Sequence, residues 1–417
     1  MRLARVLAAV LALLLCAGAQ ASERYVVNAG GVAALVDARG EALIGGADVS
    51  AVFEVRRGAL YAAGAAGDYG LYDADGGYLA GPFEMIDAMD GALIFRRGGL
   101  YGAMDDAGKI LIAPEWTQLA ATGEGYLALN TSPLDEQPDE VLFLTPYGAA
   151  TDTGVSVDGG LTPPSEGRMP FRAPDGRFGC LDAGGHPVVA AEWGWIGPFR
   201  DGAAIVSDGA VYGLIDRDGA LIVPPKYLWL QRGDGLLAGL REDGALELLS
   251  PDGREVYGEI PAASGDVSLA GSWAAVRNAD GVTLYDRRGA AVATLPEALI
   301  FPGLDGQVVV SEGAWGAACQ YLMDPDGRLV GPFQRILPLT AGRYAFAEFG
   351  EDYTRARFGL MDAGGTVLLE AEYREIAPAG EDRLVLVDDE AVYFADADGN
   401  VLRSWAREGR QTIGGGR

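Results

Sequence analysis

The sequence has 417 residues, of which 49% are hydrophobic and 22% charged, a balance that supports an apolar core and argues against wholesale disorder. Its 62 glycines, about twice the usual share, show no collagen period and favour many tight turns between short strands. The formal net charge of −27 is typical of a solvated secreted surface and disfavours partners such as nucleic acid or anionic lipid.

Residues 1–21 have the pattern of a secretory signal peptide. Arg2 and Arg5 precede an apolar run too short to span a bilayer, and Ala19-Gln20-Ala21 forms a small-x-small cleavage site. We expect cleavage after Ala21 and a secreted or extracytoplasmic location, at the cell surface or in the periplasm. Lipidation at Cys16 and retention as an uncleaved anchor remain alternatives. No later apolar run approaches the length of a membrane-spanning helix, so no other segment is predicted to span a membrane.

From residue 35 onward one phrase recurs: two apolar residues, then Asp, two variable residues and Gly. Successive phrases follow one another at a nearly regular interval, and Thr145 and Ser250 replace the Asp in two of them. A short side-chain oxygen at the first position suits a turn, and glycine at the fourth suits the left-handed residue of a G1-bulge hairpin. Each phrase therefore predicts a β-hairpin turn. The anchor residues, those at the Asp position, are Asp37, Asp73, Asp105, Thr145, Asp182, Asp216, Ser250, Asp286, Asp324, Asp362 and Asp396.

The stretches around each turn predict at least three strands per unit. The two residues before each anchor point to opposite sheet faces, yet both are apolar in every unit. A lone unit of about 36 residues cannot bury both faces, so neighbouring units must cover one another. We expect an all-β tandem array of about eleven antiparallel repeats over residues 22–404. Propeller-like closure is favoured, in one ring or more, and an open β-solenoid remains the rival.

Two passages resemble bacterial WG-repeat proteins. They are Tyr212-Gly213-Leu214-Ile215-Asp216-Arg217-Asp218-Gly219 with its continuation to Tyr227, and Phe199-Arg200-Asp201-Gly202-Ala203-Ala204-Ile205-Val206. Five units keep an aromatic-Gly pair, with Tyr or Phe in place of the usual tryptophan. The resemblance implies an all-β repeat fold and assigns no single biochemical activity.

Two regions depart from the repeat. Residues from about 130 to 175 contain seven prolines and an acidic stretch, which we interpret as a surface insertion within a degenerate unit. Residues 405–417 read as a loose C-terminal tail. Cys180 and Cys319 each lie in an apolar run, which favours buried thiols over a disulfide.

Few residues suggest chemistry. The only histidine is His186, beside a turn, which disfavours catalytic triads and zinc sites that use histidine. The regular aspartates are explained by turn chemistry, so we assign no catalytic, cofactor-binding or metal-binding residue and expect no cofactor. A hydrolase using a carboxylate pair remains an alternative. The Asp-x-Asp-Gly turns lack the further ligands of an EF-hand and suggest at most weak Ca²⁺ binding.

Three tryptophans follow the second strand of their units. Trp193 lies at an offset from its anchor at which aromatics recur, and this periodicity favours core packing. Trp195 and Trp229 fall outside that register and are the candidates for ligand contact.

We therefore expect an exported repeat protein that acts as a binding or scaffold module for a protein or glycan partner, without catalysis. A carboxylate-based extracellular hydrolase is one alternative. A passive acidic surface protein with weak Ca²⁺ binding is another. Nucleic acid is not an expected partner.

Overall fold

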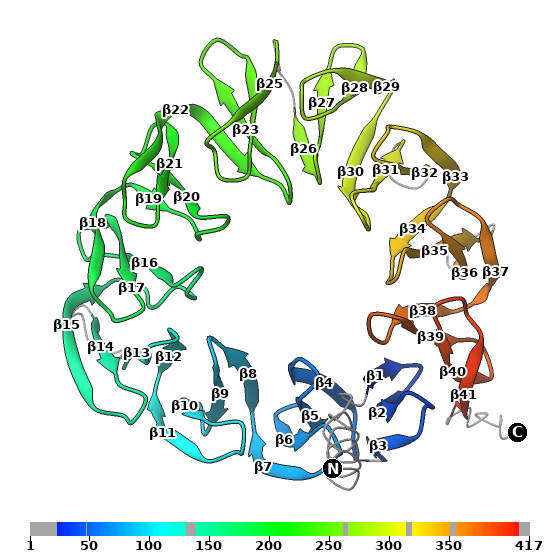
Figure 1. Ribbon diagram of the computed structural model, residues 1–417, viewed down its shortest axis with the longest axis horizontal. Helices are drawn as coiled ribbons and strands as arrows, with labels where there is room; N and C mark the ends of the chain where they lie inside the picture. The colour runs from blue at the N-terminus through cyan, green and yellow to red at the C-terminus, as the bar shows by residue number, and fades with distance from the viewer. Residues whose placement is uncertain are drawn as a thin grey trace, which may run out of the picture.

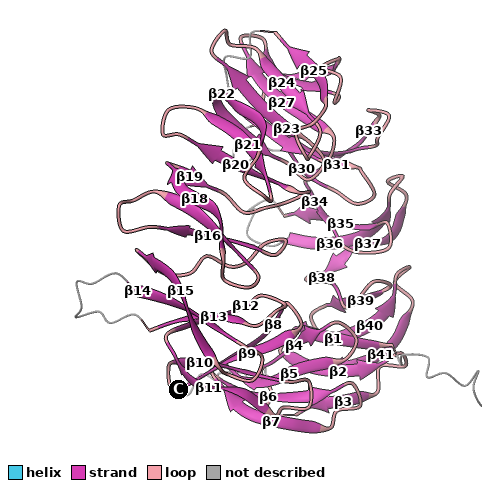
Figure 2. Ribbon diagram, turned by 60° about the vertical axis from the view of Figure 1, so that its left-hand side comes forward, coloured by secondary structure: helices cyan, strands magenta, loops and turns pink. Residues whose placement is uncertain are grey.

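A computed structural model describes residues 23–46, 48–130, 139–261, 266–313, 319–350 and 356–407. Within these ranges the regular secondary structure consists of strands, without any helix, which confirms the predicted all-β class (Figure 2). It follows that no described segment is an apolar helix able to cross a membrane. The predictions for the signal peptide and for most of the tail fall outside these ranges and stay predictions.

The strands of the described ranges pair antiparallel into ten sheets, and within each sheet they follow chain order. Seven sheets have four strands, two have three and one has seven. The seven-stranded sheet carries two of the predicted turns because β22 serves both halves, pairing with β21 through its first part and with β23 through its second.

The first five sheets run from residue 24 to residue 193. Their strands are β1 (Arg24–Ala29), β2 (Val32–Asp37), β3 (Ala42–Gly45); β4 (Ala51–Arg56), β5 (Leu60–Ala65), β6 (Asp68–Asp73), β7 (Tyr78–Phe83); β8 (Met85–Met89), β9 (Ala92–Arg97), β10 (Leu100–Met104), β11 (Ile110–Trp116); β12 (Gln118–Ala121), β13 (Tyr126–Leu129), β14 (Asp139–Leu144), β15 (Ala150–Val157); β16 (Arg168–Arg172), β17 (Phe178–Asp182) and β18 (Pro187–Trp193).

The other five sheets run from residue 195 to residue 406. Their strands are β19 (Trp195–Ile196), β20 (Ala203–Ser207), β21 (Tyr212–Asp216), β22 (Leu221–Arg232), β23 (Leu237–Arg241), β24 (Leu246–Leu249), β25 (Val256–Ile260); β26 (Val267–Ala270), β27 (Trp273–Asn278), β28 (Gly281–Tyr285), β29 (Ala291–Leu295); β30 (Ala298–Pro302), β31 (Val308–Glu312), β32 (Cys319–Met323), β33 (Leu329–Phe333); β34 (Arg335–Pro338), β35 (Arg343–Phe349), β36 (Ala356–Asp362), β37 (Val367–Tyr373); β38 (Glu375–Pro378), β39 (Arg383–Val387), β40 (Ala391–Asp396) and β41 (Val401–Ala406).

Figure 1 shows the sheets arranged in a ring in chain order, from β1 in blue to β41 in red. In most sheets the first strand lies towards the centre and the last lies at the rim. Several last strands lead through a single residue into the first strand of the next sheet, as β37 leads into β38 through Arg374. This order is that of a propeller.

The predicted hairpin turns are confirmed. At Asp216 the carboxylate oxygen Oδ1 accepts the backbone N–H groups of Asp218 at 3.0 Å and Ala220 at 2.9 Å, and Gly219 has a φ of +83°. At Asp362 the N–H of Thr366 holds the pKa of the carboxyl below its ordinary value. The same two Oδ1 bonds occur at Asp37, Asp73, Asp105, Asp182, Asp286, Asp324, Asp362 and Asp396.

The core of the described chain is divided among the interfaces between sheets. Its buried side chains form eleven clusters, and each cluster joins two neighbouring sheets or the two halves of the seven-stranded sheet. Strands are buried on both faces, as the apolar pattern predicted. Stability therefore comes from stacking of sheet on sheet.

The first and last sheets close the ring, so the rival open solenoid is not the observed form. One cluster joins Tyr25 and Val27 of β1 to Val385 of β39 and Phe394 of β40. The rings of Tyr25 and Phe394 lie 5.4 Å apart between centroids. Arg403 of β41 forms an ion pair with Glu41, beside the first turn.

The turn glycines show that this closing contact repeats the other interfaces. At Gly365, whose φ is +82°, a Cβ atom would lie 2.2 Å from Cγ1 of Val330 in the preceding sheet. At Gly40, whose φ is +77°, a Cβ atom would lie 2.6 Å from Cβ of Arg403 in the last sheet. Glycine is thus required at these turn positions for two reasons: the left-handed backbone conformation and the close approach of the neighbouring sheet.

The stretch from 130 to 175 contains regular strands: β14 and β15 pair across the turn that begins at Thr145. Cys180 is buried and Cys319 half-buried, and both are free thiols. Burial raises the pKa of the Cys180 thiol to about 12, which makes it inert as a nucleophile at neutral pH.

Candidate functional site

The inner edge of the first sheet has no partner strand among the described residues. The turn between β1 and β2 is Gly30-Gly31, with φ values of +59° and +86°, and it is flanked by the pair Ala29 and Val32. In such a two-residue hairpin the flanking pair is hydrogen-bonded, and every second residue directs its backbone groups to the other edge. The backbone groups that face the open edge belong to Arg24, Val26 and Asn28.

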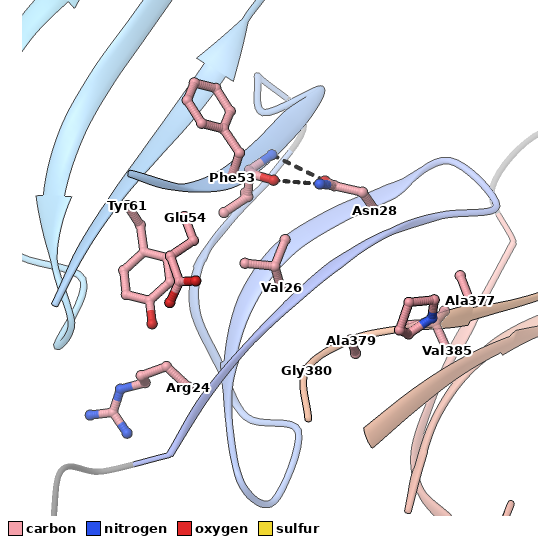
Figure 3. A pocket seen from close by; sticks show the side chains of 12 residues that line it. Arg24, Val26, Asn28, Phe53, Glu54, Tyr61, Ala377, Ala379, Gly380 and Val385 are labelled. Atoms are coloured by element: carbon pink, nitrogen blue, oxygen red, sulfur yellow. Dashed lines mark hydrogen bonds between the residues drawn. The ribbon is translucent and has the colours of Figure 1, made fainter. Parts of the chain in front are cut away.

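A cavity of about 350 Å³ lies along this edge (Figure 3), and we call it the edge slot. The last sheet, through β38 and β39, forms one wall, and β4 and β5 of the second sheet form the other. The slot is lined by Arg24, Val26, Asn28, Val52, Phe53, Glu54, Tyr61, Ala377, Pro378, Ala379, Gly380 and Val385.

The edge slot occupies the place of a first strand. Arg24 of β1 pairs with the anchor Asp37, just as Arg383 of β39 pairs with the anchor Asp396. In the last sheet β39 has a further strand, β38, on its inner edge. The corresponding edge of β1 faces the edge slot instead.

Side chains of β1 fix the second-sheet wall of the slot. The amide of Asn28 donates to the carbonyl of Val52 and accepts its N–H at 3.0 Å, a pair of bonds drawn in Figure 3. The Arg24 guanidinium donates to the carbonyl of Ala74 and to Asp75 Oδ1 at 2.7 Å. The backbone of β4 at Val52 is therefore satisfied, whereas the β1 edge has no strand partner among the described residues.

One buried hydroxyl in the slot has no hydrogen-bond partner within the described part of the chain. Tyr61 is 1% exposed, and no described residue makes a hydrogen bond with its hydroxyl oxygen. Burial, together with the nearby Glu54 carboxylate, raises the pKa of Tyr61. A buried hydroxyl without a partner costs free energy, so its environment is incomplete.

Tyr344 shows what completes such an environment. It pairs with the residue before its anchor, as Tyr61 does in its own sheet. Its hydroxyl accepts the N–H of Leu304 at 2.7 Å and donates to Oε1 of Gln307 at 2.9 Å. Both partners lie in the loop after β30, the first strand of the preceding sheet. The sheet that precedes Tyr61 has no such strand among the described residues.

Of the three acids that line a second cavity, of about 470 Å³, two are already engaged. Asp105 accepts two N–H groups of its own turn, and Asp106 forms an ion pair with Arg56 at 3.0 Å. Across the described ranges no group of three or more His, Cys, Asp or Glu side chains is placed to hold a metal ion.

One carboxylate is buried inside the seven-stranded sheet. Glu247, 8% exposed, accepts hydrogen bonds from Lys226 at 2.8 Å, Tyr227 at 2.6 Å and Arg241 at 3.0 Å. Burial alone would raise the pKa of Glu247, but these donors hold it below its ordinary value. Because both oxygens have partners, we interpret the group as a cross-link between β22, β23 and β24.

The two predicted ligand-contact residues differ in exposure. Trp195, on β19, is 40% exposed, and a Cβ atom at Gly197 would lie 2.6 Å from its ring, so the ring covers that glycine. Trp229, on β22, is half-buried and packs against the cluster shared with β27. Trp193 packs against a core cluster as predicted. His186 is exposed and lies 3.3 Å from the carboxylate of its own turn.

Trp195 and Trp229 share a register that the sequence analysis missed. Trp195 follows the anchor Asp182 at the same separation as Trp229 follows Asp216. They therefore occupy the same position in adjacent units, directly before a buried aliphatic residue of the inner strand. The edge slot was also missed. Its signal was available, since residues 22–36 have room for two strands before the first turn and the other units have more.

The chain matches the WG containing repeat over residues 178–210 and 212–230, which confirms the resemblance over that stretch. No curated protein matches it. Among solved structures it is similar to a eukaryotic initiation factor, with 11% identity, a TM-score of 0.41 and coverage of 84% of this chain and 98% of that one. BamB from Moraxella catarrhalis gives 14% identity, a TM-score of 0.30 and coverage of 65% and 91%. The designed protein Ika8 gives 12%, 0.29, 69% and 95%. All three TM-scores lie below 0.5.

Proposed function

We propose that the mature chain is an exported, non-catalytic scaffold that binds a protein partner on the inner strands β19, β22 and β30. The export part of the proposal rests on the signal-like residues 1–21. The scaffold part rests on the closed ring of sheets, in which the turns and most buried polar groups have structural explanations.

A difference within the ring carries the proposal. At the position that Trp195 holds relative to its anchor, the units with β12 and β38 have the polar residues Gln118 and Glu375, so the fold accepts polar side chains there. At the same position the units with β22 and β30 have Trp229 and Leu299. Trp229 also packs against the cluster shared with β27, but packing alone does not require an apolar residue at Leu299, which is 51% exposed.

We call the exposed apolar residues on β19, β22 and β30 the tryptophan arc. Their chemistry favours a protein over a glycan as the partner. Phe301 on β30 is 45% exposed and Leu228 on β22 is 48% exposed, in addition to Trp195 and Leu299. A tryptophan ring stacks on sugars, but exposed Leu side chains gain most from apolar protein side chains. A glycan that stacks on Trp195 alone remains the alternative.

Arrays of extracytoplasmic proteins and of glycans, probed with labelled residues 22–417, test the proposal. We expect protein ligands that Trp195→Ala and Leu299→Ala each weaken about tenfold or more, as for an anchor residue worth over 1.4 kcal/mol. Tyr147→Ala is the matched control, because Tyr147 is 92% exposed on the turn between β14 and β15. Equal loss in the control, or no binding above an equally acidic unrelated protein, would refute the proposal.

The hydrolase alternative gains no support from Asp105, Asp106 or Glu247. Asp105 serves a turn, Asp106 forms an ion pair, and the buried Glu247 has three donors. A catalytic acid needs an oxygen free to reach a substrate.

A further inference from the structure

We propose that the tryptophan arc takes a cationic segment of a protein partner, in which one Lys or Arg lies between large apolar side chains and pairs with Asp266. This inference rests on the proposed function and names the chemistry of the partner. Asp266 directly precedes β26, the inner strand that follows β22 and comes before β30 around the ring (Figure 1). The carboxylate therefore belongs to a sheet that lies between two sheets of the arc.

Asp266 lies at the same level of the ring as the arc. In each unit one residue of the strand after the inner strand pairs with the residue before the anchor, and the residue three positions later marks this level. Opposite that residue lie Trp195, Trp229 and Leu299 in their own units. In the unit of β26 the marking residue is Arg277, whose backbone N–H donates to the carbonyl of Asp266 at 2.9 Å. The pairs that fix the count are Ala204 with Ile215, Leu237 with Leu249, Ala274 with Tyr285 and Val308 with Met323.

The sheet of β26 packs against both of its neighbours. Trp229 packs against a cluster that includes Val276 of β27, the strand paired with β26. Ala270 of β26 shares another cluster with Ile300, the residue after Leu299. Following the ring at this level, Asp266 thus comes directly after an aromatic side chain and directly before an aliphatic one.

Carboxylates outnumber cations at this point of the described chain. Arg277 is shared between Asp266 at 3.8 Å and Glu297 at 3.7 Å, and both distances exceed the roughly 2.7–2.9 Å of a charge-assisted hydrogen bond. A third carboxylate, Glu312, belongs to the residue paired with Ala298. The Asp266 side chain is 95% exposed, so its oxygens are accessible to an ammonium or guanidinium group. A cation from a partner would complement this excess of negative charge.

The apolar neighbours set the rest of the partner's chemistry. A segment that is charged throughout would leave Leu299 without an apolar contact, whereas a wholly apolar segment would desolvate Asp266 without pairing it. The level continues from Leu299 to Arg335 of β34, which is exposed. A partner cation is therefore expected at Asp266 and not beyond Leu299, where it would meet a like charge.

Three synthetic peptides test the charge at Asp266. Each is an amphipathic helix of about 18 residues, which spans roughly 27 Å. Its leucine stripe is interrupted at the centre by Lys, norleucine or Glu, and glutamine on the polar face leaves no other charge. Fluorescence anisotropy measures their dissociation constants for residues 22–417. We expect the Lys peptide to bind about threefold to fivefold more tightly than the norleucine peptide, as for an exposed ion pair, and the Glu peptide to bind most weakly.

Variants of the chain separate a local pairing from the general acidity of the protein. Asp266→Lys should reverse the order of the three peptides, and the milder Asp266→Asn should make the Lys and norleucine peptides equal. Asp326→Lys, at an exposed aspartate of a turn, is the matched control and should leave the order unchanged. Raising NaCl from about 0.05 to about 0.5 M should remove the preference for Lys, because salt screens exposed charges. The same change of order in Asp266→Lys and Asp326→Lys, or no change in either, would overturn the inference.

Leu299→Ala and Trp195→Ala distinguish this inference from the proposed function. If both variants weaken all three peptides while the order ignores Asp266, the arc still binds apolar segments and only the assigned charge is wrong. Peptides that bind regardless of Trp195 and Leu299, or that do not bind at about 1 mM, would overturn the inference. The protein and glycan arrays would then decide the proposed function independently.

Discussion

The two three-stranded sheets, β1–β3 and β16–β18, have the same strand order but different inner edges. At one end of β16, Ser165 and Arg168 exchange backbone hydrogen bonds of 2.8 and 3.0 Å. At the other end, the N–H of Asp158 donates to the carbonyl of Arg172 at 2.9 Å. Residues 158–165 therefore cover the edge of β16, although they form no regular strand. The edge of β1 faces the edge slot instead.

The difference teaches where an inner strand comes from in this ring. The cover of β16 is the chain that arrives from β15, the last strand of the preceding sheet. For β1 the preceding sheet in space is the last one in sequence, so no described segment reaches its edge in this way. A missing strand is thus a consequence of joining a linear chain into a ring, and it falls at the joint.

The largest effect should come from the closing interface itself. Phe394→Ala, at the contact of the last sheet with the first, and Phe171→Ala, at the contact of β16 with the preceding sheet, should each cost about 3–5 kcal/mol of unfolding free energy. Both rings are 5% exposed or less. Urea denaturation measures the two values. A much smaller loss for Phe394→Ala would show that the ring is open at this joint in solution.

A smaller effect should follow when the covered edge of β16 is uncovered. Asp158→Pro removes the N–H that reaches the carbonyl of Arg172 and should cost about 1–3 kcal/mol. Asp158→Ala is the control, because it keeps that N–H and loses an exposed ion pair with Arg172 worth about 1 kcal/mol or less. The two variants are compared by urea midpoint and by amide hydrogen exchange in β16. Equal losses would mean that the covering segment adds nothing through its backbone.

The turns could be predicted from sequence because their chemistry is local. An aspartate oxygen, two N–H groups and a left-handed glycine all lie within one short turn, as at Asp216 and Gly219. The apolar pattern likewise predicted sheets buried on both faces. Such features need no knowledge of which sheets become neighbours.

The edge slot and the tryptophan arc depend on what lies across the ring. The slot exists because Val385 and Tyr61, which are near opposite ends of the sequence, come to face the same strand edge. No local pattern around either residue encodes that contact. Trp195 and Trp229 were noticed individually, but their common register appears only when the two units are aligned on their anchors.

The smallest loss of stability should come from removing the anchor aspartate of a turn, a feature that the two three-stranded sheets share. Asp37→Ala in the first sheet and Asp182→Ala in the fifth each remove an oxygen that accepts two backbone N–H groups at 2.8 to 2.9 Å. Since both turns are exposed, water replaces part of each bond and we expect a similar loss of about 1 kcal/mol in both, measured by thermal unfolding. Asp326→Ala, at an exposed aspartate two residues after the anchor Asp324, is a control for removing a carboxylate without touching an anchor. Equal losses at Asp37 and Asp182 would confine the difference between the two sheets to their inner edges. A loss at Asp37 several times larger would mean that the first turn also holds the ring closed through Gly40 and its close contact with Arg403.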